Sequence, residues 1–448
     1  MSEIEIEIDG NLVKASQGDS IISIADREGI DVPRFCYHKK LSVAANCRMC
    51  LVDVEGIPKA QPACSTPAAN GMKINTKNDK AKFAQKAVME FLLINHPLDC
   101  PICDQGGECE LQDVAMEYGS DVSKFNLGKR IVPDKGIGAL IQTDMTRCIH
   151  CTRCVRFGAE VAGIVEMGGT GRGEDVKIEP FLTEGIQSEL SGNMIDVCPV
   201  GALTSKPFRY EARTWQMNAV QSVARHDLVG SNIFTQSYRG KVKRVVARDN
   251  DSINETWISD RDRFSYEGLN HESRALKPKV KIDGQWQETD WQEALQFAVD
   301  GIKNNVKNPD QLGVLASKHS SLEEFYLMQK LARKFGTENI DFRLDQSQLS
   351  IGSSLESSIT LKEIESIDHA LIIGSYTRLE QPMINHRIRK AALDGASVNS
   401  INSKNFDFNF KTKCDALTSP QKLFSTLQSI LKAILLKTKK DIPNDLSK

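Results

Sequence analysis

Cysteine is the residue type with the greatest capacity for chemistry in this 448-residue chain. Eleven of its 12 cysteines lie within the first 198 residues, and only Cys414 lies in the remaining 250. Disulfide scaffolds are typical of small secreted chains without a large core. This chain is long, and it starts with alternating acidic and apolar residues rather than a signal peptide. The cysteines therefore predict metal ligation in a reducing compartment.

The first group consists of four cysteines with the spacing C-x10-C-x2-C-x13-C: Cys36, Cys47, Cys50 and Cys64. Four thiolates can close a zinc site or hold a 2Fe-2S cluster, and the C-x2-C pair does not choose between them. The surrounding loop is rich in small residues, which let backbone amides hydrogen-bond cluster sulfurs. The pattern favours a 2Fe-2S cluster and leaves zinc as the alternative.

The last group consists of three closely spaced cysteines and a distant fourth: Cys148, Cys151, Cys154 and Cys198. Thiolates at i, i+3 and i+6 can each bind a different iron of a cubane, whereas three such neighbours serve a single zinc ion poorly. Pro199 turns the chain away after the last ligand, as in ferredoxin-type runs. A two-cluster ferredoxin would carry another cysteine where this chain has Gly158, so we expect one 4Fe-4S cluster.

The middle group has only three cysteines: Cys100, Cys103 and Cys109. A cubane needs four ligands, and His96 stands four residues before the first of the three. A neutral imidazole in place of a thiolate would make the cluster less negative and raise its potential. We expect His96 to complete this set. The alternatives are a histidine that caps helix carbonyls, ligation by Asp99 or Asp104, and a cluster that lacks one iron.

The remaining chemical patterns are weaker. Cys414 is expected to be an inert buried thiol. His38 and His150 lie beside sets that already have four cysteines, so we expect them to support ligands or lie at the surface. The sequence contains no Walker motif, serine triad or convincing pair of carboxylates. No catalytic residue is therefore predicted in this chain.

The elements that must position the first two groups can also be predicted. Residues 4–15 alternate apolar side chains around Asp9-Gly10, which suits a type I′ hairpin turn, and a short helix is expected over residues 20–28. A hairpin followed by a helix indicates a β-grasp fold. Residues 79–95 predict a helix that ends at His96-Pro97. Its expected apolar face is formed by Ala84, Ala87, Val88, Phe91 and Leu92.

The pattern changes after the last group. Residues 217–275 carry short β-like runs, such as residues 241–247. Farther along, expected strands alternate with expected helices, which favours a parallel sheet covered by helices. The strands are 312–316 and 370–373, and the helices are 321–335, one that starts near Pro382, and 423–434.

Composition argues against three classes of protein: nucleic-acid-binding proteins held by bulk positive charge, disordered chains and membrane-spanning chains. Lys and Arg number 57 against 59 Asp and Glu, a formal net charge of -2, which argues against nucleic-acid binding through bulk positive charge. Hydrophobic residues make up 40% and charged residues 26%, as in ordinary folded proteins. No apolar run approaches the roughly 20 residues needed to cross a bilayer.

The three cysteine groups, taken in their order along the chain, closely resemble those of the large iron-sulfur subunits (the G subunits) of NADH-quinone oxidoreductase, respiratory complex I. The resemblance covers roughly residues 1–275 and rests on long motifs. They are Pro33-Arg-Phe-Cys-Tyr-His38, Cys47-Arg-Met-Cys50, His96-Pro-Leu-Asp-Cys100, Cys103-Asp-Gln-Gly-Gly-Glu-Cys109, Arg147-Cys-Ile-His-Cys-Thr-Arg-Cys-Val-Arg156, Ser191-Gly-Asn-Met-Ile-Asp-Val-Cys-Pro-Val-Gly-Ala-Leu203 and Trp257-Ile-Ser-Asp-Arg261. The rest resembles more loosely the molybdopterin-oxidoreductase-like domain of the family, through Asp290-Trp-Gln-Glu-Ala294 and Arg387-Ile-Arg-Lys-Ala391.

The expected fold class is an α+β iron-sulfur region followed by a β-rich segment and an incomplete α/β molybdopterin-oxidoreductase-like domain. The expected domains are a β-grasp 2Fe-2S ferredoxin domain (1–78), a 4Fe-4S domain with one histidine and three cysteine ligands (79–118), a 4Fe-4S ferredoxin-like domain (119–216), a β-rich start of the molybdopterin-oxidoreductase-like region without a cluster (217–275) and a partial α/β molybdopterin-oxidoreductase-like domain (276–448).

The resemblance implies one 2Fe-2S cluster and two 4Fe-4S clusters. Their ligands would be Cys36, Cys47, Cys50 and Cys64; His96, Cys100, Cys103 and Cys109; and Cys148, Cys151, Cys154 and Cys198. It implies a component of an H⁺-translocating NADH:quinone oxidoreductase that passes electrons from a flavin toward quinone, without a substrate site in this chain. The expected partners are the flavin/NADH-binding subunit and the ferredoxin-like and quinone-site subunits of the peripheral arm.

The same resemblance sets the expected location. It is the cytoplasmic side of the bacterial inner membrane, or the matrix side in a mitochondrion. Membrane contact is expected only through the complex, and no nucleic acid is expected as a partner.

Two departures from the family pattern matter. Some members carry a fourth cubane near the start of the second domain, but residues 199–413 contain no cysteine, so that cluster is not expected here. Members are usually longer, and a molybdenum cofactor is not expected in the incomplete domain. Whether the chain is a fragment or a shortened form stays open.

Two alternative functions stay open as well. One is a diaphorase-type iron-sulfur subunit of a soluble NAD-linked hydrogenase or formate dehydrogenase. The other is a zinc-stapled scaffold without a redox role. Co-purifying partners would distinguish the first alternative, and metal content would distinguish the second.

Overall fold

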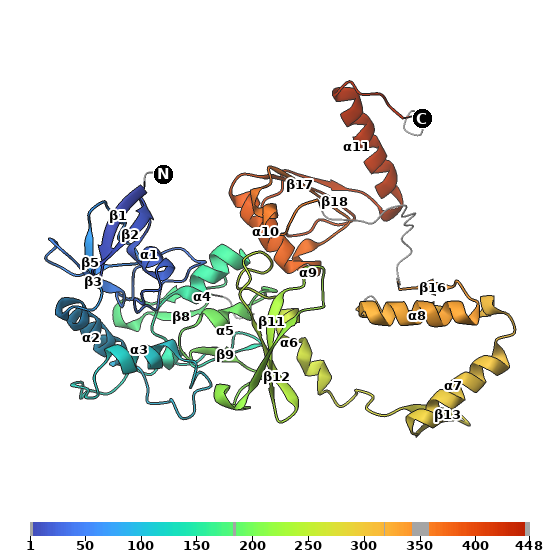
Figure 1. Ribbon diagram of the computed structural model, residues 1–448, viewed down its shortest axis with the longest axis horizontal. Coiled ribbons are helices and arrows are strands. Elements are labelled where there is room, and N and C mark those ends of the chain that lie inside the picture. Colours follow the sequence, from blue (N-terminus) through green and yellow to red (C-terminus); the bar gives the residue numbers. More distant parts are fainter. Residues whose placement is uncertain (1–2, 182–184, 318, 343–357, 444–448) are drawn as a thin grey trace. The chain divides into compact units, whose positions relative to one another are not determined.

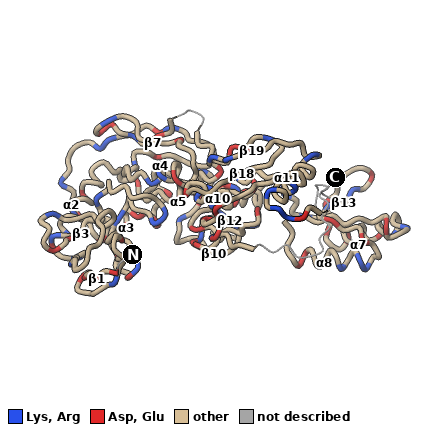
Figure 2. Tube along the Cα trace, turned by 90° about the horizontal axis from the view of Figure 1, so that it is seen from above, with Lys and Arg blue, Asp and Glu red and all other residues tan. Residues whose placement is uncertain are grey.

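The structure is a computed structural model that describes residues 3–181, 185–317, 319–342 and 358–443. The chain forms two compact units, one made of Met1–Phe264 and Leu361–Lys448 and the other of Ser265–Thr360. Figure 1 shows the elements of both units. None of the helices in the described ranges is long and apolar enough to cross a membrane. Basic and acidic residues are interspersed along the chain (Figure 2).

The N-terminal part is a five-stranded sheet with the strand order β2-β1-β5-β3-β4. Its elements are β1 (Glu3–Ile8), β2 (Asn11–Ser16), α1 (Ile21–Arg27), β3 (Leu51–Val54), β4 (Gln61–Pro62) and β5 (Lys73–Asn75). β1 and β2 form the predicted hairpin, and Asp9 and Gly10 at its turn have φ angles of +51° and +85°. Positive φ at both positions is the type I′ geometry. β1 pairs with β5 in parallel, which gives the mixed sheet of the predicted β-grasp fold.

Helix α1 packs on this sheet because alternate residues of β1 face it. Ile4, Ile6 and Ile8 are buried in one core with Ile21 and Ile24 of α1. A register slip of one residue would turn all three β1 isoleucines toward water, at a cost of roughly 1.5–3 kcal/mol each. This core fixes the sheet from which the first cysteine loop leaves.

Two helices flank the middle cysteine group: α2 (Asp79–Leu93) and α3 (Glu110–Tyr118). Asn78 caps α2, since its side chain accepts a hydrogen bond from the Ala81 backbone N–H at 2.9 Å. The helix ends at Leu93, two residues before the predicted end, and His96-Pro97 follows it. The histidine therefore lies just beyond the helix, where it can turn toward the cysteines.

The predicted apolar face of α2 is wrong in part. The buried residues of the helix are Ala81, Gln85 and Met89, and two of the five predicted positions, Ala87 and Phe91, are exposed. The Gln85 side-chain amide donates to the Leu51 carbonyl at 3.0 Å. A buried polar contact with β3 thus selects a face of the helix that apolar spacing alone does not identify.

The last cysteine group lies among short elements. They are β6 (Ile141–Thr143), η1 (Met145–Arg147), α4 (Arg153–Arg156), the π-helical turn η2 (Phe157–Ala162), β7 (Met167–Thr170), η3 (Gly173–Asp175), β8 (Lys177–Pro180), α5 (Asn193–Val197) and β9 (Leu203–Ser205). β6 pairs with β9, and β7 pairs with β8, both antiparallel. The pairing of β6 with β9 returns the chain after Cys198 to the start of the cysteine loop.

A cysteine-free β-rich segment follows. Its elements are η4 (Thr214–Gln216), β10 (Asn218–Val223), β11 (Asn232–Tyr238), β12 (Lys241–Ala247) and α6 (Asp260–Phe264). The three strands form an antiparallel sheet in chain order. β12 coincides with the predicted run 241–247.

The remainder of the first unit contains a parallel sheet, as predicted, and its strand order is β17-β18-β19. Its elements are η7 (Glu363–Ser366), β17 (His369–Ile373), α9 (Thr377–Glu380), α10 (Pro382–Leu393), β18 (Ser397–Asn402), β19 (Cys414–Leu417), η8 (Pro420–Lys422) and α11 (Leu423–Lys437). Ile388 of α10 packs with Ile372, Val398 and Phe408 in a small core. α10 therefore covers one face of the sheet.

The second unit has few buried residues. Its elements are η5 (Ser265–Leu269), β13 (Lys279–Ile282), β14 (Gln285–Glu288), α7 (Trp291–Asn305), η6 (Pro309–Gln311), β15 (Val314–Leu315), α8 (Leu322–Phe335) and β16 (Ile340–Asp341). α8 has the predicted capping box, in which Ser321 and Glu324 exchange bonds of 2.8 and 3.2 Å. The strand predicted over residues 312–316 has only two residues, β15, and it pairs with β16 in another sheet than that of β17.

Candidate metal centres

All 12 cysteines are free thiols, and the eleven early ones lie in the first compact unit. The structure gathers them into the three predicted groups. Among the described residues, no group of three or more Cys, His, Asp or Glu side chains is placed to hold a single metal ion. In a cluster the ligands are spread over two or four irons, so the ligands of a cluster need not converge on one point as those of a single ion do.

Hydrogen bonds between sulfurs link the four cysteines of the first group in the order Cys47, Cys36, Cys64 and Cys50. The Cys36 sulfur receives hydrogen bonds from the thiols of Cys47 and Cys64, which lower its pKa, and Cys64 lowers the pKa of Cys50 in the same way. The pKa values of the donors Cys47 and Cys64 are raised correspondingly. One sulfur-rich site therefore forms between the loop after α1 and the ends of β3 and β4.

The backbone of this loop is bent to bring the sulfurs together. Ala45 and Arg48, on either side of Cys47, have φ angles of +50° and +60°, in the left-handed region that few non-glycine residues adopt. The Cys36 N–H donates to the Cys47 sulfur at 3.4 Å. A backbone donor directed at a ligand sulfur is one of the contacts that tune a cluster.

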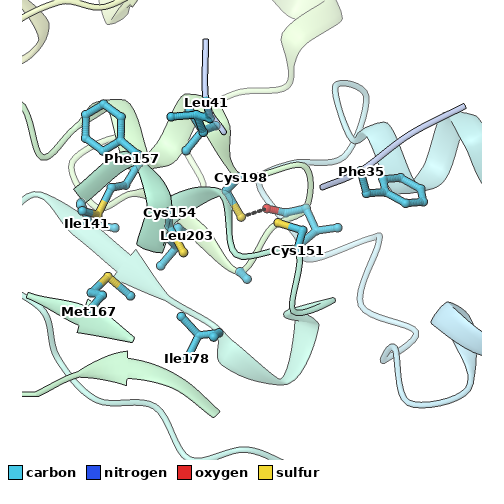
Figure 3. Packing of buried hydrophobic residues seen from close by; sticks show 14 of the residues in the cluster. Phe35, Leu41, Ile141, Cys151, Cys154, Phe157, Met167, Ile178, Cys198 and Leu203 are labelled. Carbon is cyan, nitrogen blue, oxygen red and sulfur yellow. Dashed lines mark hydrogen bonds between the residues drawn. The ribbon is translucent and has the colours of Figure 1, made fainter. Parts of the chain in front are cut away.

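The last group is packed inside an apolar core. Figure 3 shows Cys151, Cys154 and Cys198 among Phe157, Leu203 and other apolar side chains. His150 and Thr152, between the cysteines, have φ angles of +54° and +60°, which coil the loop tightly. Hydrogen bonds also hold the sulfurs: the His150 N–H donates to the Cys148 sulfur at 3.4 Å, and the Cys198 thiol donates to the Val200 carbonyl at 3.0 Å.

Burial makes these thiols reluctant to ionise. It raises the pKa of Cys148, Cys151 and Cys198 to about 12 and raises that of Cys154 well above its usual value. A buried thiolate needs a nearby positive charge to be stable. The donor set therefore fits a bound cationic metal centre that replaces the thiol protons.

The middle group combines a histidine with three cysteines at a cavity. His96, Cys100 and Cys109 line a cavity of about 420 Å³, whose apolar lining includes Leu111 and Met116. Cys103 is buried beside them, and burial raises its pKa and that of Cys109, the latter to about 11. The cavity is large enough to hold a body of several atoms among these side chains.

The imidazole of His96 is prepared to act as a neutral ligand. Burial, assisted by Lys129 and Arg147, lowers its pKa to about 4, so the ring is uncharged at neutral pH. The backbone of Arg147 forms a hydrogen bond with the His96 ring. The buried Nδ1 atom of the same ring has no partner among the described residues. A metal-binding histidine typically has one ring nitrogen held by a backbone carbonyl and the other directed at the metal.

The two alternative ligands of the middle group are engaged elsewhere. Asp99 Oδ2 accepts from Arg147 Nε at 3.1 Å. Asp104 Oδ1 accepts from the Tyr210 N–H at 3.0 Å. Both carboxylates thus serve to hold the cysteine loop in place.

Arg147 and the segment after Cys198 connect the last group with the middle group. Arg147 is 4% exposed and donates to the Gly201 carbonyl at 3.3 Å as well as to Asp99. The Cys109 sulfur lies 3.8 Å from the Pro199 carbonyl. Gly201 passes so close to Cys103 that a Cβ at this position would lie 2.1 Å from its sulfur.

Two further arginines connect the last group with the first. Arg156 Nη2 donates to the carbonyls of Cys36 and Cys151 at 2.5 and 3.2 Å. Arg153 Nη2 donates to the Tyr37 carbonyl at 2.9 Å. Together with Arg147, these contacts join the last group to both of the other two, although the middle group separates it from the first along the chain.

One apolar core joins the three groups. Its buried members include Cys36, Cys109, Cys151, Cys154 and Cys198, and Cys47 and Cys148 pack against it. Such a core excludes water from the space between the groups.

The sequence prediction missed the residues that connect the groups. Arg147, Arg153, Arg156 and Gly201 all lie inside the motifs that carry the cysteines, but nothing in the spacing of these residues indicates which distant loop each one contacts. The prediction for Cys414 is wrong, because this thiol is exposed in β19. His38 contacts Trp257, and His150 faces Arg130 at 3.3 Å.

Comparison with known families gives five consecutive matches. Residues 1–79 match a 2Fe-2S iron-sulfur cluster binding domain, and residues 85–124 match the NADH-ubiquinone oxidoreductase-G iron-sulfur binding region. Residues 138–204 match the ferredoxin-like domain of NADH-quinone oxidoreductase subunit 3. Residues 217–267 match the 4Fe-4S domain of NADH-ubiquinone oxidoreductase NDSU1/NuoG-like proteins, although this segment contains no cysteine. Residues 274–442 match the molybdopterin oxidoreductase family.

Curated relatives match most of the chain. The G subunit of NADH-quinone oxidoreductase of Rickettsia conorii is 44% identical over 390 residues, which cover 86% of this chain and 57% of the relative. The 75 kDa subunit of NADH-ubiquinone oxidoreductase of Reclinomonas americana is 43% identical, covering 88% and 59%. The mitochondrial NADH dehydrogenase [ubiquinone] iron-sulfur protein 1 of Solanum tuberosum is 46% identical, covering 86% and 52%. The chain thus spans between half and three fifths of the length of these relatives.

A solved structure of an NAD⁺-reducing [NiFe]-hydrogenase in the H₂-reduced state also matches, with a TM-score of 0.42 and 24% identity over 47% of this chain and 91% of that chain. This likeness is too weak to bear on function.

Proposed function

The chain belongs to the family of large iron-sulfur subunits (the G subunits) of NADH-quinone oxidoreductase, and we propose that it conducts electrons within such a complex. The proposal assigns it one 2Fe-2S cluster and two 4Fe-4S clusters. The 2Fe-2S ligands are Cys36, Cys47, Cys50 and Cys64, and the 4Fe-4S ligands are His96, Cys100, Cys103 and Cys109 in one set and Cys148, Cys151, Cys154 and Cys198 in the other. These clusters would supply one-electron chemistry at potentials set by their ligands and surroundings.

The observation that carries the proposal is the packing of all three ligand sets against one another. Arg147, Arg153 and Arg156 connect the sets, and one apolar core contains residues of each. Electron conduction requires closely spaced redox centres in a dry environment. A zinc-stapled scaffold would have no need for this close association, since each zinc site would stabilise its own loop.

The residues of the chain would set the properties of the three sites. His96 contributes a neutral ligand, so the middle cluster would carry one negative charge less than a four-thiolate cluster and have a higher potential. The buried guanidinium groups of Arg147 and Arg153 add positive charge beside the ligand loops. The apolar core keeps water away from the buried sulfurs of Cys151, Cys154 and Cys198, which would favour the less charged state of the cluster that they hold.

The proposal extends the family assignment to a setting for the chain. The chain would receive electrons that a flavin/NADH-binding subunit takes from NADH, and would pass them toward ferredoxin-like and quinone-site subunits. It would lie on the cytoplasmic side of a bacterial inner membrane, or on the matrix side in a mitochondrion, held to the membrane only through the complex. The proposal includes neither a nucleic acid nor a molybdenum cofactor.

Metal analysis and EPR test the proposal. The purified, anaerobically handled chain should contain about ten iron atoms with matching acid-labile sulfide, and EPR at stepped potentials should resolve three reducible centres. A colourless chain that contains only zinc would refute it. Purification from membranes separates the remaining alternative, because a diaphorase-type subunit would co-purify with a hydrogenase or formate dehydrogenase and without a quinone-site partner.

A further inference from the structure

A buried tryptophan from the cysteine-free segment lies between two of the ligand sets. Trp257 is 1% exposed. Its ring stacks on His38 with a centroid distance of 5.5 Å and an interplanar angle of 28°, and it packs against Phe157 at 5.1 Å. His38 lies two residues after Cys36, and Phe157 lies three residues after Cys154. The indole thus lies between the loop of the first set and η2, the helical turn that follows Cys154.

Ion pairs hold the first loop against the segment that carries the tryptophan. Lys40 Nζ lies 2.6 Å from Asp251 Oδ1 and 3.3 Å from Glu255 Oε1. Glu255 is itself buried and lies 2.9 Å from Lys390. The residues just after His38 are therefore tied to the residues just before Trp257, and the ring stack does not depend on one contact alone.

Hydrogen bonds hold the other side of the tryptophan against α5, the helix that precedes Cys198. The backbone N–H of Trp257 donates to the Asn254 carbonyl at 2.9 Å, and the side-chain amide of Asn254 donates to the Trp257 carbonyl at 3.1 Å. The next residue, Ile258, exchanges bonds of 3.0 and 2.7 Å with the side chain of Asn193 in α5. The position of Trp257 is therefore coupled to the position of Cys198, which directly follows α5.

Charged residues of α6 strengthen the same attachment. Asp260 accepts from the Ser191 hydroxyl and the Gly192 N–H, both at 2.6 Å. Arg263 Nη1 donates to Asp196 of α5 at 3.0 Å. The segment 257–263 is thus firmly attached to the loop and helix that carry Cys198.

We propose that Trp257 is a positioning residue that sets the spacing between the first and the last ligand set. The inference rests on the proposed function, because the spacing matters only if both sets hold clusters. Arg153 and Arg156 also join the two sets, but hydrogen bonds only limit how far the loops can separate. The incompressible indole limits how closely they can approach. This gives the cysteine-free segment 217–267 a role that needs no cluster of its own.

The test uses the full chain with its clusters in place and compares Trp257→Leu, Trp257→Phe and His38→Ala with the unaltered protein. In fully reduced samples, EPR measures the line broadening that arises from the magnetic interaction between neighbouring clusters, which depends steeply on their separation. Iron content and the signal of each cluster are recorded in parallel. Phe408→Leu is the control, since Phe408 is a buried aromatic residue in a separate core, that of β17, β18 and α10, and its ring contacts among the described residues include neither His38 nor Trp257.

Trp257→Leu and His38→Ala should retain all clusters but change the broadening, and Trp257→Phe, which keeps a ring in place, should restore most of it. The control should match the unaltered protein. Unchanged broadening in Trp257→Leu at full iron content would overturn the proposal. If Trp257→Leu loses iron, the test rests on His38→Ala. His38 is only half-buried, and its replacement removes the same ring contact. Unchanged broadening in His38→Ala would also overturn the proposal. Failure of the proposed function is a separate result, namely an unaltered chain without reducible clusters.

Discussion

Replacing Gly201 by alanine is expected to remove the middle cluster and leave the other two in place. Gly201 lies three residues after Cys198, where its backbone passes the sulfur of Cys103. Its φ angle is outside the left-handed region, so alanine is compatible with the backbone and only the added methyl group matters. The substitution therefore tests the contact between the last and the middle ligand set.

The size of the effect follows from the distances. An alanine Cβ would lie 2.1 Å from Cys103 Sγ and 3.3 Å from Gln105 Cβ. Ordinary contact distances begin near 3.5 Å, so the sulfur would have to retreat by about 1.4 Å. Metal–ligand distances tolerate deviations of only about 0.2 Å. Overpacking of this kind costs about 1–3 kcal/mol, which a chain of this size can survive while losing the cysteine as a ligand.

Iron analysis and EPR of the reduced protein provide the assay. The iron content is expected to fall from about ten to about six atoms per chain, the change for one lost 4Fe-4S cluster. The signal assigned to the His96-ligated centre should disappear, and the two other signals should persist with unchanged potentials. Loss of all three signals would instead indicate that the chain no longer folds.

Gly136→Ala is the matched control. This glycine also has a φ angle outside the left-handed region, and no atom lies within 4 Å of a Cβ at its position. It should retain the full iron content and all three signals. Full iron content and an unchanged middle signal in Gly201→Ala would refute the packing argument.

Three more substitutions test other parts of the reasoning. His96→Cys should keep the middle cluster but lower its potential, because a thiolate adds negative charge; an unchanged potential in an EPR redox titration would contradict ligation by His96. Asp262→Asn should raise the melting temperature at pH 7 but have little effect near pH 4. Burial, with Asp227, raises the pKa of Asp262 to about 6, above its ordinary value of 3.8. Protonation therefore favours the folded state, and up to about 3 kcal/mol of stabilisation is lost as the pH rises from 4 through 6; equal effects at both pH values would contradict this. Cys414→Ser should leave iron content and EPR signals unchanged because this thiol is exposed and far from the three groups in sequence, and a loss of iron would show that it is a ligand.

Local parts of the fold were predictable because the chain itself enforces them. The hairpin at Asp9-Gly10 follows from the backbone freedom of these two residues, and α8 begins and ends at the signals that its capping box and Gly336 provide. The buried face of α2 was not predictable, because Gln85 is buried only through a hydrogen bond to a strand far away in sequence. Cysteine is among the residue types most often buried, so sequence alone favours an interior Cys414, whereas β19 exposes it.

Residue types and their spacing were enough to predict three groups of candidate ligands and to identify the family to which the chain belongs. Spacing within a group is a local property, since cysteines three residues apart cannot separate far. Only the tertiary structure brings the last group into contact with both the first and the middle group. The pairing of Thr143 with Leu203 returns the chain after Cys198 to the cysteine loop and against Cys103. Contacts of this kind join residues about 60 to 100 positions apart, and no local periodicity encodes them.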